Sequence, residues 1–343
     1  MNLVTGGTGL VGSHLLLDLV KSGEKVRATR RTNSDTRRVR KVFSYYSKDA
    51  DSLFDRIEWV EADMMDYQSV LNAMEGVNKL YHCAAFVSFQ SADKWEVLRT
   101  NIEGTANMVN AALELKLEKF GFVSSIAALG KSLTGEEINE ELIWRPSRHT
   151  SAYSESKFKS EMEVWRGISE GMNAVIINPS VIIGPGNWES GSGLFYKRIL
   201  KGMRYYTLGV NGYVDVRDVA MAFTSLMNSD ISGERFIVSA KNLSLKDVFS
   251  YIAQSIGRKT PAVYASPRLT SLAQRFDALR ARMLFSPVRL PREAMFSAHA
   301  ESRFSSQKLR KALGFEFIPM ENSFMETGRI FLDDLGQAAP AVH

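Results

Sequence analysis

The chain of 343 residues contains one cysteine and five histidines. Cys83 alone cannot close a disulfide within the chain, and the histidines are too scattered to supply a metal-ligand pattern. We therefore expect no disulfide and no bound metal, so any redox chemistry must come from elsewhere. No stretch approaches the roughly 18 consecutive apolar residues of a membrane-spanning helix. An apolar strand begins almost at Met1, which leaves no room for a signal peptide, so a cytoplasmic location is expected.

The charge is unevenly distributed, although the formal net charge is only +5. Residues 258–311 hold twelve Lys and Arg side chains against Asp277, Glu293 and Glu301, so the rest of the chain is net acidic. A basic field of this kind favours anionic ligands, anionic lipid or nucleic acid. A solvated basic face accounts for the same charges, and we expect no nucleic-acid partner.

Strand-like apolar runs alternate with helical patterns over the first 180 residues. The predicted strands lie near Val4 and at 25–29, 56–61, 79–85, 120–125 and 174–179, with predicted helices between them at 67–74 and 93–115. This alternation is typical of a doubly wound parallel sheet. We therefore predict an α/β fold in which residues 1–180 form a Rossmann-type domain.

The alternation decays after Pro185, and residues 181–335 are predicted to form mainly a smaller substrate-binding lobe. Short strands at 213–216 and 235–238 suggest a return to the sheet at about 213–240. Predicted helices follow the same segment at 219–227, 244–256, 269–284 and 305–313. Residues 336–343 are expected to form a flexible tail.

A glycine triplet follows the first strand and opens the first helix. Gly6 permits a tight turn, Gly9 lets the backbone approach a pyrophosphate, and Gly12 lets helix and strand pack closely. Thr8, Leu10 and Val11 complete this turn. The segment therefore predicts a dinucleotide-binding site.

The second strand ends in arginines, where enzymes that use NAD usually carry a carboxylate. Arg30 and Arg31 would pair with the 2′-phosphate of NADP through charge-assisted hydrogen bonds, which favours NADP(H) over NAD(H). A basic loop that starts a helix explains the same residues. Asp63, after the third strand, would accept a hydrogen bond from the adenine amino group, or it would cap the following helix.

Three residues further along are suited to carbonyl reduction. Tyr153 would donate a proton, and Lys157, one helical turn later, would lower the pKa of the phenol toward neutrality. Ser125, at the end of the fifth strand, would hydrogen-bond the carbonyl oxygen. A Tyr-x-x-x-Lys pattern is common on surface helices, but here it follows a phosphate turn in the same chain.

With these segments the sequence resembles the extended short-chain dehydrogenases/reductases of the NAD-dependent epimerase/dehydratase family. The segments that carry the resemblance are Thr5–Gly12, Asp63–Asp66, His82–Ala85, Asn101–Thr105, Val123–Ser125, Tyr153 with Lys157, and Asn178–Gly186. The resemblance implies that Ser125, Tyr153 and Lys157 are the catalytic triad, and that Asn101 supports the lysine through the adjacent helix.

The same resemblance implies further cofactor contacts and an assembly. Lys157 would also bind the nicotinamide ribose, Met64, Ala84 and Ala85 would line the cofactor, and Pro179 would pack beside the nicotinamide. A homodimer is expected on the same basis.

Within the family, Val26–Arg31 resembles the dihydroflavonol and cinnamoyl-CoA reductase branch, in which an arginine here recognises NADP. Tyr213–Ala220 resembles that branch and the hydroxysteroid dehydrogenases. Nucleotide-sugar epimerases typically carry Arg-Asp-Phe where this chain has Asn211–Tyr213. This departure weakens an epimerase interpretation.

Two segments bear on the substrate and on partners. The stretch Phe86-Val87-Ser88-Phe89, after the fourth strand, would form an apolar or aromatic substrate wall, or its aromatic residues would only pack within their loop. Residues 268–285 form a basic amphipathic helix that would contact an anionic membrane, or would pack on the substrate lobe or on a dimer partner.

The sequence therefore predicts an NADP(H)-dependent reductase or dehydrogenase of a carbonyl or secondary alcohol on an apolar small molecule. One alternative is a nucleotide-sugar epimerase or dehydratase, in which the cofactor returns to its starting redox state within one turnover. An alternative of another class is a non-catalytic protein that senses NADP or binds RNA.

Overall fold

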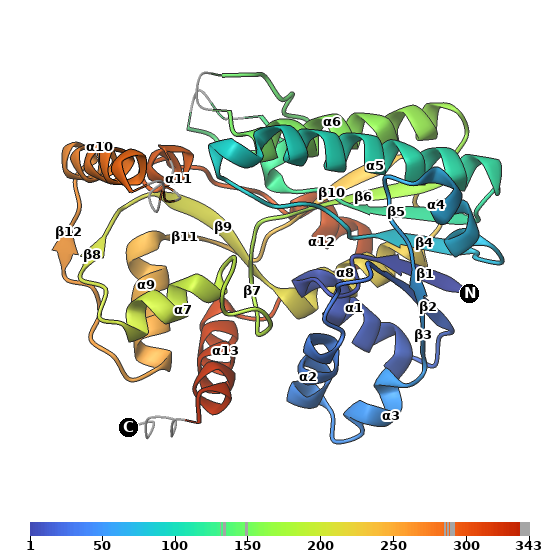
Figure 1. The fold of residues 1–343 in the computed structure, drawn as a ribbon, viewed down its shortest axis with the longest axis horizontal. Coiled ribbons are helices and arrows are strands. Elements are labelled where there is room, and N and C mark those ends of the chain that lie inside the picture. The colour runs from blue at the N-terminus through green and yellow to red at the C-terminus, as the bar shows by residue number, and fades with distance from the viewer. Residues whose placement is uncertain are drawn as a thin grey trace.

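The computed structural model describes residues 1–336 apart from 131, 133, 134, 148, 149, 285, 287 and 289–291. Its centre is a seven-stranded sheet in the order β10-β6-β5-β4-β1-β2-β3 (Figure 1). The strands are β1 (Asn2–Thr5), β2 (Val26–Arg30), β3 (Ile57–Glu61), β4 (Lys79–His82), β5 (Lys119–Val123), β6 (Ala174–Pro179) and β10 (Glu234–Val238). All neighbouring pairs are parallel. The predicted α/β fold is confirmed, and residues 337–343 of the expected tail lie outside the described part.

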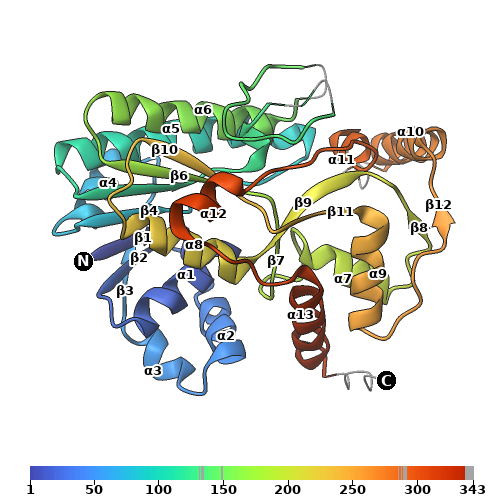
Figure 2. The ribbon, with the colours of Figure 1, turned by 180° about the vertical axis from the view of Figure 1, so that it is seen from behind.

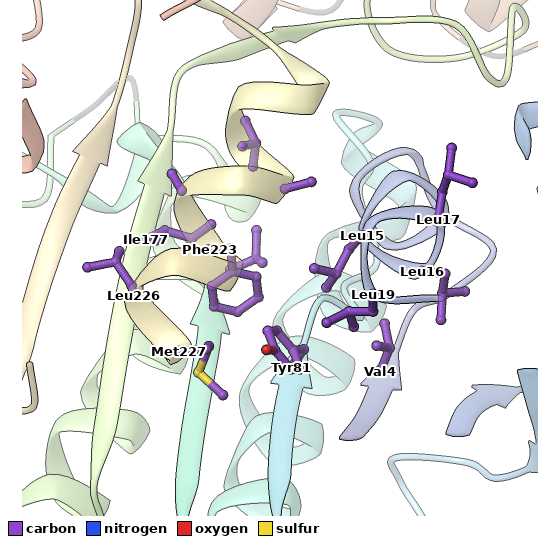
Figure 3. Packing of buried hydrophobic residues seen from close by; sticks show 14 of the residues in the cluster. Val4, Leu15, Leu16, Leu17, Leu19, Tyr81, Ile177, Phe223, Leu226 and Met227 are labelled. Atoms are coloured by element: carbon purple, nitrogen blue, oxygen red, sulfur yellow. The ribbon is translucent and has the colours of Figure 1, made fainter. Parts of the chain in front are cut away.

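Helices cover both faces of the sheet because successive strand residues point to opposite sides. Leu3 packs with α4 (Tyr67–Met74), α5 (Lys94–Glu114) and α6 (Ala152–Ser169), whereas its neighbour Val4 packs with α1 (Leu10–Lys21) and α8 (Val216–Met227). Figure 3 shows this second core, in which Tyr81 meets Phe223 edge to face at 5.2 Å between ring centroids. Strands that are buried on both faces explain the continuous apolar runs in the sequence.

The order of the strands locates the ligand crevice. The chain builds β1, β2 and β3 toward one edge, then returns to β4 beside β1 and builds β5, β6 and β10 toward the other edge. In open parallel sheets, ligands bind beyond the carboxyl ends of the strands where the direction of building reverses. That point lies between β1 and β4.

A smaller lobe follows β6. Its three-stranded sheet has the order β11-β9-β7, from β7 (Val181–Ile183), β9 (Val210–Asp215) and β11 (Lys241–Ser244). The helices α7 (Gly193–Leu200), α9 (Leu245–Ser255) and α13 (Met320–Asp334) gather beside this sheet (Figure 2). Tyr196, Ile252 and Phe324 contribute to their shared core. The division of the chain at residue 180 stays a prediction.

The remaining elements lie at the periphery. On the side of α1 these are α2 (Arg37–Tyr46) and α3 (Ala50–Phe54), and α12 (Gln307–Leu313) packs near β10. At the far end of the smaller lobe, β8 (Tyr205–Tyr206) pairs with β12 (Val263–Tyr264) near α10 (Pro267–Met283) and α11 (Arg292–Ser297). None of the helices in the described ranges has the length and apolar content that a bilayer crossing requires.

Candidate active site

The turn between β1 and α1 has the geometry that its glycines predict. Gly6 has φ +66°, and a Cβ atom there would lie 2.7 Å from the Ala84 nitrogen. A Cβ at Gly12 would lie 2.2 Å from the Gly6 oxygen. Helix α1 then begins with no side-chain cap and no acidic residue in its first turn. Its free N–H groups and positive dipole end suit an anionic group.

A pocket opens directly over this turn. Its lining is made of small and polar residues from three segments of the chain: Thr8, Gly9, Leu10, Ser13, Arg38, Val42, Gly184, Gly186, Asn187 and 190–193. The Arg38 side chain is 60% exposed and lies 3.8 Å from the Asp35 carboxylate. The sequence analysis did not single out Arg38, which reaches this pocket from α2 rather than from the end of β2.

The two predicted arginines differ from each other. Arg30 ends β2 half-buried, and its Nε has no hydrogen-bond partner among the described residues. Arg31 is exposed, and its backbone nitrogen donates to the Ser34 hydroxyl at 3.0 Å. Three cations, Arg30, Arg31 and Arg38, therefore lie along the stretch that runs from the last residue of β2 into the first turn of α2.

Asp63 lies in the loop after β3, where its carboxylate accepts from the Met65 backbone at 2.9 Å. Asp66, and not Asp63, caps α4 by accepting from the backbone nitrogens of Gln68 and Ser69. The capping alternative for Asp63 is therefore wrong. Met64 packs so closely on Gly104 that a Cβ there would lie 2.1 Å from the Met64 Cε.

The end of β4 is held by a buried polar network. The His82 ring hydrogen-bonds the Thr5 hydroxyl at 2.7 Å and the Thr105 hydroxyl at 3.2 Å. Burial lowers the pKa of His82 to about 3, so the ring is neutral. Thr5 also accepts from the Ala84 backbone nitrogen at 3.2 Å. These bonds position Ala84 and Ala85 against the glycine turn, while Pro179 ends β6 in a buried position.

Ser125, Tyr153 and Lys157 meet beyond the carboxyl end of β5. Ser125 follows this strand and accepts from the Ala127 nitrogen at 3.1 Å. Tyr153 and Lys157 both belong to α6, one turn apart. The Tyr153 phenol interacts with the Ser125 side chain, and the Lys157 ammonium donates to the Val123 carbonyl at 2.7 Å. The predicted residues are therefore brought together, with the phenol turned toward the serine.

The pKa shifts of Tyr153 and Lys157 differ in part from expectation. Burial raises the pKa of Tyr153, and only its hydrogen bond with Ser125 acts in the opposite direction. Burial lowers the pKa of Lys157 to about 8, against a raising effect of Glu161. The expectation that Lys157 lowers the tyrosine pKa is therefore wrong for this structure, because desolvation of the phenol dominates. The phenol is protonated at neutral pH.

One aromatic residue of the predicted stretch 86–89 lies against the tyrosine. Phe89 contacts Tyr153 edge to face at 5.6 Å and is 47% exposed. Phe86 is half-buried in the same loop. Its backbone nitrogen donates to the side-chain oxygen of Asn101 at 2.7 Å. The side-chain nitrogen of Asn101 also donates to the Phe86 carbonyl at 3.0 Å. The apolar wall beside the phenol is therefore carried by Phe89.

Asn101 supports α6 through the residue next to the lysine. Its amide nitrogen donates to the Ser156 hydroxyl at 2.9 Å, and its backbone carbonyl accepts from Ser160 at 2.8 Å. Asn101 therefore ties α5 to the first turns of α6 and to the Phe86 loop. This agrees with the indirect supporting role that the resemblance implies.

A buried carboxylate behind the site was missed by the sequence analysis. Glu161, fully buried one turn after Lys157, accepts from Ser124 at 2.7 Å, from Asn178 at 2.9 Å and from Arg235 at 2.9 Å. Asn178 also donates to the Ser125 carbonyl at 3.0 Å. The spacing of Tyr153, Lys157 and Glu161 at four and eight residues was the available signal, because it places all three on one face of a helix.

Comparisons with known proteins agree with this geometry. The NAD dependent epimerase/dehydratase family matches residues 2–239. Sterol demethylase protein B of Methylococcus capsulatus is 31% identical over 91% of this chain and 92% of its own. A putative dihydroflavonol 4-reductase of Synechocystis is 30% identical over 75% of this chain and 73% of its own.

Two more similarities extend over nearly the whole chain. Cinnamoyl-CoA reductase 1 of Petunia hybrida is 27% identical over 94% of this chain and 90% of its own. The crystal structure of gox2253 superposes with a TM-score of 0.80 and 28% identity, covering 98% of this chain and 99% of the other. The chain therefore belongs to the NAD-dependent epimerase/dehydratase family, as an enzyme of the extended short-chain dehydrogenase/reductase type in its dihydroflavonol reductase-like branch.

Proposed function

We propose that the protein is an NADP(H)-dependent reductase or dehydrogenase of a carbonyl or secondary alcohol on an apolar small molecule. The observation that carries the proposal is that three residues meet beyond the carboxyl end of β5. The Lys157 ammonium donates to the Val123 carbonyl, two residues before Ser125, and Tyr153 lies one turn before Lys157 on the same face of α6. A protonated phenol is a proton donor, which suits the reductive direction.

The residues of the crevice fit a dinucleotide. The uncapped end of α1 and the glycines Gly9 and Gly12 would hold the pyrophosphate. Ala84, Ala85, Met64 and Pro179 would line the cofactor, and Asp63 would approach the adenine. When bound, the cofactor supplies the hydride that reaches the carbonyl carbon.

The roles of the chain's own side chains follow from their positions. Ser125 would hold the substrate oxygen by a hydrogen bond, and Tyr153 would deliver the proton to that oxygen. The ammonium of Lys157 would bind the nicotinamide ribose, as the resemblance implies. Asn101 would keep α6 and the Phe86 loop in register.

The Phe89 ring against Tyr153 supports an apolar substrate. The relative named sterol demethylase protein B supports a substrate of the same character. We also propose a homodimer, as the resemblance implies, and a cytoplasmic location stays an expectation. Family membership as an enzyme replaces the non-catalytic alternative.

NADPH consumption tests the function directly. The purified protein is incubated with NADPH and a panel of steroid ketones and aromatic aldehydes, and separately with UDP-glucose and oxidised NAD or NADP. We expect net oxidation of NADPH that depends on an apolar carbonyl compound. Conversion of UDP-glucose into its epimer with no net NADPH consumption would instead establish the epimerase alternative.

The NADP preference rests on Arg30, Arg31 and Arg38, and Arg38 offers the clearest test. Replacing Arg38 by Ser is expected to weaken NADPH binding by about ten- to a hundredfold, since a charge-assisted hydrogen bond contributes roughly 1.5–3 kcal/mol. Binding of NADH should change little. Titration calorimetry with both cofactors measures the two effects.

Arg37→Ser is the matched control, because Arg37 is 89% exposed and pairs with the same Asp35. It should leave both affinities within about twofold. Equal losses for NADPH and NADH in the Arg38 variant would contradict the assignment to the 2′-phosphate.

A further inference from the structure

Helix α10 presents an apolar stripe to solvent at one end of the molecule. Five of its side chains lie at helical spacing and are 43–70% exposed: Leu269, Leu272, Phe276, Leu279 and Met283. None of them belongs to the hydrophobic clusters formed within the described residues. Both views place α10 at the outer edge of the smaller lobe, beside β8 and β12 (Figures 1 and 2). Packing of this stripe on the substrate lobe, one of the alternatives from sequence, is therefore wrong.

The helix packs through its opposite face. Asp277 and Ala281 are buried, and Thr270 hydrogen-bonds the His299 ring at 2.8 Å. Asp277 is the acidic residue of this helix, and its carboxylate turns inward to pair with Arg280 at 2.8 Å. The first turn is fixed by Ser266, which accepts from the Leu269 nitrogen, and by Pro267. The stripe is therefore held outward by a helix that is anchored on its other side.

A row of arginines borders the stripe. Arg268, Arg275 and Arg282 are all exposed and lie seven residues apart, which is about two helical turns. At 100° per residue this row falls beside the leucines and Phe276, and not on the buried face. A helix with apolar side chains on its outward face and cations along their border lies in the plane of a membrane surface, with the cations at the headgroups.

We propose that α10 docks the enzyme on an anionic lipid surface. Charge favours this occupant over a second copy of the chain, because two such faces would bring their arginine rows together without an outward carboxylate from the helix. On the neighbouring strands β8 and β12, the side chains of Tyr205, Val263 and Tyr264 are also 43–54% exposed.

The segment that follows α10 is hydrogen-bonded to the loop that carries Phe89. Gln90 donates to the carbonyl of Val288, just beyond α10, at 3.0 Å. One residue before Gln90, Phe89 rests on the Tyr153 ring. An apolar substrate dissolved in a bilayer would reach the crevice through this corner. That route rests on the proposed function, whereas the docking itself does not.

Vesicle flotation with the full chain tests the docking. Vesicles of phosphatidylcholine alone are compared with vesicles of equal parts phosphatidylcholine and phosphatidylglycerol. We expect flotation with the anionic vesicles only, and release by high salt. Replacing Arg268, Arg275 and Arg282 by Gln should weaken the partition about a hundredfold, because each cation near an anionic surface contributes about fivefold. Replacing Leu272, Phe276 and Leu279 by Ser should also abolish flotation.

The control replaces Arg56, Arg99 and Arg329, exposed on other faces, by Gln, and it should float like the original protein. Circular dichroism and NADPH binding establish that each variant is folded. Failure of the original protein to bind anionic vesicles, or equal losses in the control, would overturn the proposal. A lower oligomeric state in the Leu272, Phe276 and Leu279 variant, without vesicle binding by the original protein, would assign the stripe to a second copy. Normal docking without NADPH turnover would reject the proposed function and leave the docking intact.

Discussion

Replacing Tyr153 by Phe is expected to lower kcat by roughly 10²–10⁴-fold, which is the usual contribution of a positioned general acid. The variant keeps the ring that contacts Phe89 and removes only the hydroxyl that contacts Ser125. NADPH affinity should therefore stay within about twofold. Steady-state kinetics with an accepted substrate and NADPH titration calorimetry measure the two quantities.

Tyr67→Phe is the matched control, because it also removes one phenol hydroxyl, whose partner is Glu114 at the end of α5 and not a residue of the site. It should retain the original kcat. A Tyr153→Phe variant with nearly full activity would show that another group supplies the proton. Loss of NADPH binding together with activity would show that the hydroxyl serves the cofactor rather than the reaction.

Replacing Glu161 by Gln is expected to cost about 3–5 kcal/mol of unfolding free energy, because it removes one partner of a buried ion pair. Arg235, 15% exposed, would keep its bonds to backbone carbonyls but lose its counter-charge. The hydrogen bonds from Ser124 and Asn178 would weaken as well. Urea unfolding measures the loss.

A pH profile separates positioning of the site from stability alone. Glu161 raises the pKa of Lys157, which burial lowers to about 8. Without the Glu161 carboxylate the pKa of Lys157 falls further, so its ammonium loses the proton at lower pH. If the charge of Lys157 is needed for turnover, the alkaline decline of kcat/KM should therefore move to lower pH in the Glu161 variant.

Glu163→Gln is the control on the same helix, since Glu163 pairs with Arg166 and is 29% exposed. This substitution should lower the unfolding free energy by less than about 1 kcal/mol and leave the pH profile of kcat/KM unchanged. A Glu161 variant with reduced stability but an unchanged profile would show that the carboxylate is structural only.

Some elements were predictable because local sequence determines them. The strand at 174–179 is an apolar run buried on both faces, and the glycine turn predicts the start of α1. The helix predicted at 269–284 runs from Pro267 to Met283, starting at the signals of Ser266 and Pro267.

Other elements depend on contacts distant in sequence. β7 has three residues and β11 reads Lys-Asn-Leu-Ser, so neither shows a strand pattern before it pairs with β9. The strand predicted at 213–216 runs from Val210 to Asp215. The strand ends at Asp215 because the side chain of this residue caps the start of α8. The helix Met320–Asp334 was not predicted at all.

The site shows the same limit. Ser125, Tyr153 and Lys157 could be predicted because the sequence shows directly the spacing of Tyr153 and Lys157 and the place of Ser125 at the end of a strand. The approach of Arg38 to the glycine turn, the contact of Phe89 with Tyr153 and the bonds of Glu161 to Arg235 join different segments of the chain. The direction of the Tyr153 pKa shift depends on burial, which spacing does not reveal.

The most direct test of the proposed chemistry is a crystal structure of the protein with oxidised NADP bound. We expect the pyrophosphate over Gly9 and Gly12, the 2′-phosphate beside Arg38, and the nicotinamide within reach of the Tyr153 hydroxyl. A nicotinamide ring far from Tyr153 and Ser125, with the phenol unable to turn toward it, would contradict the proposal.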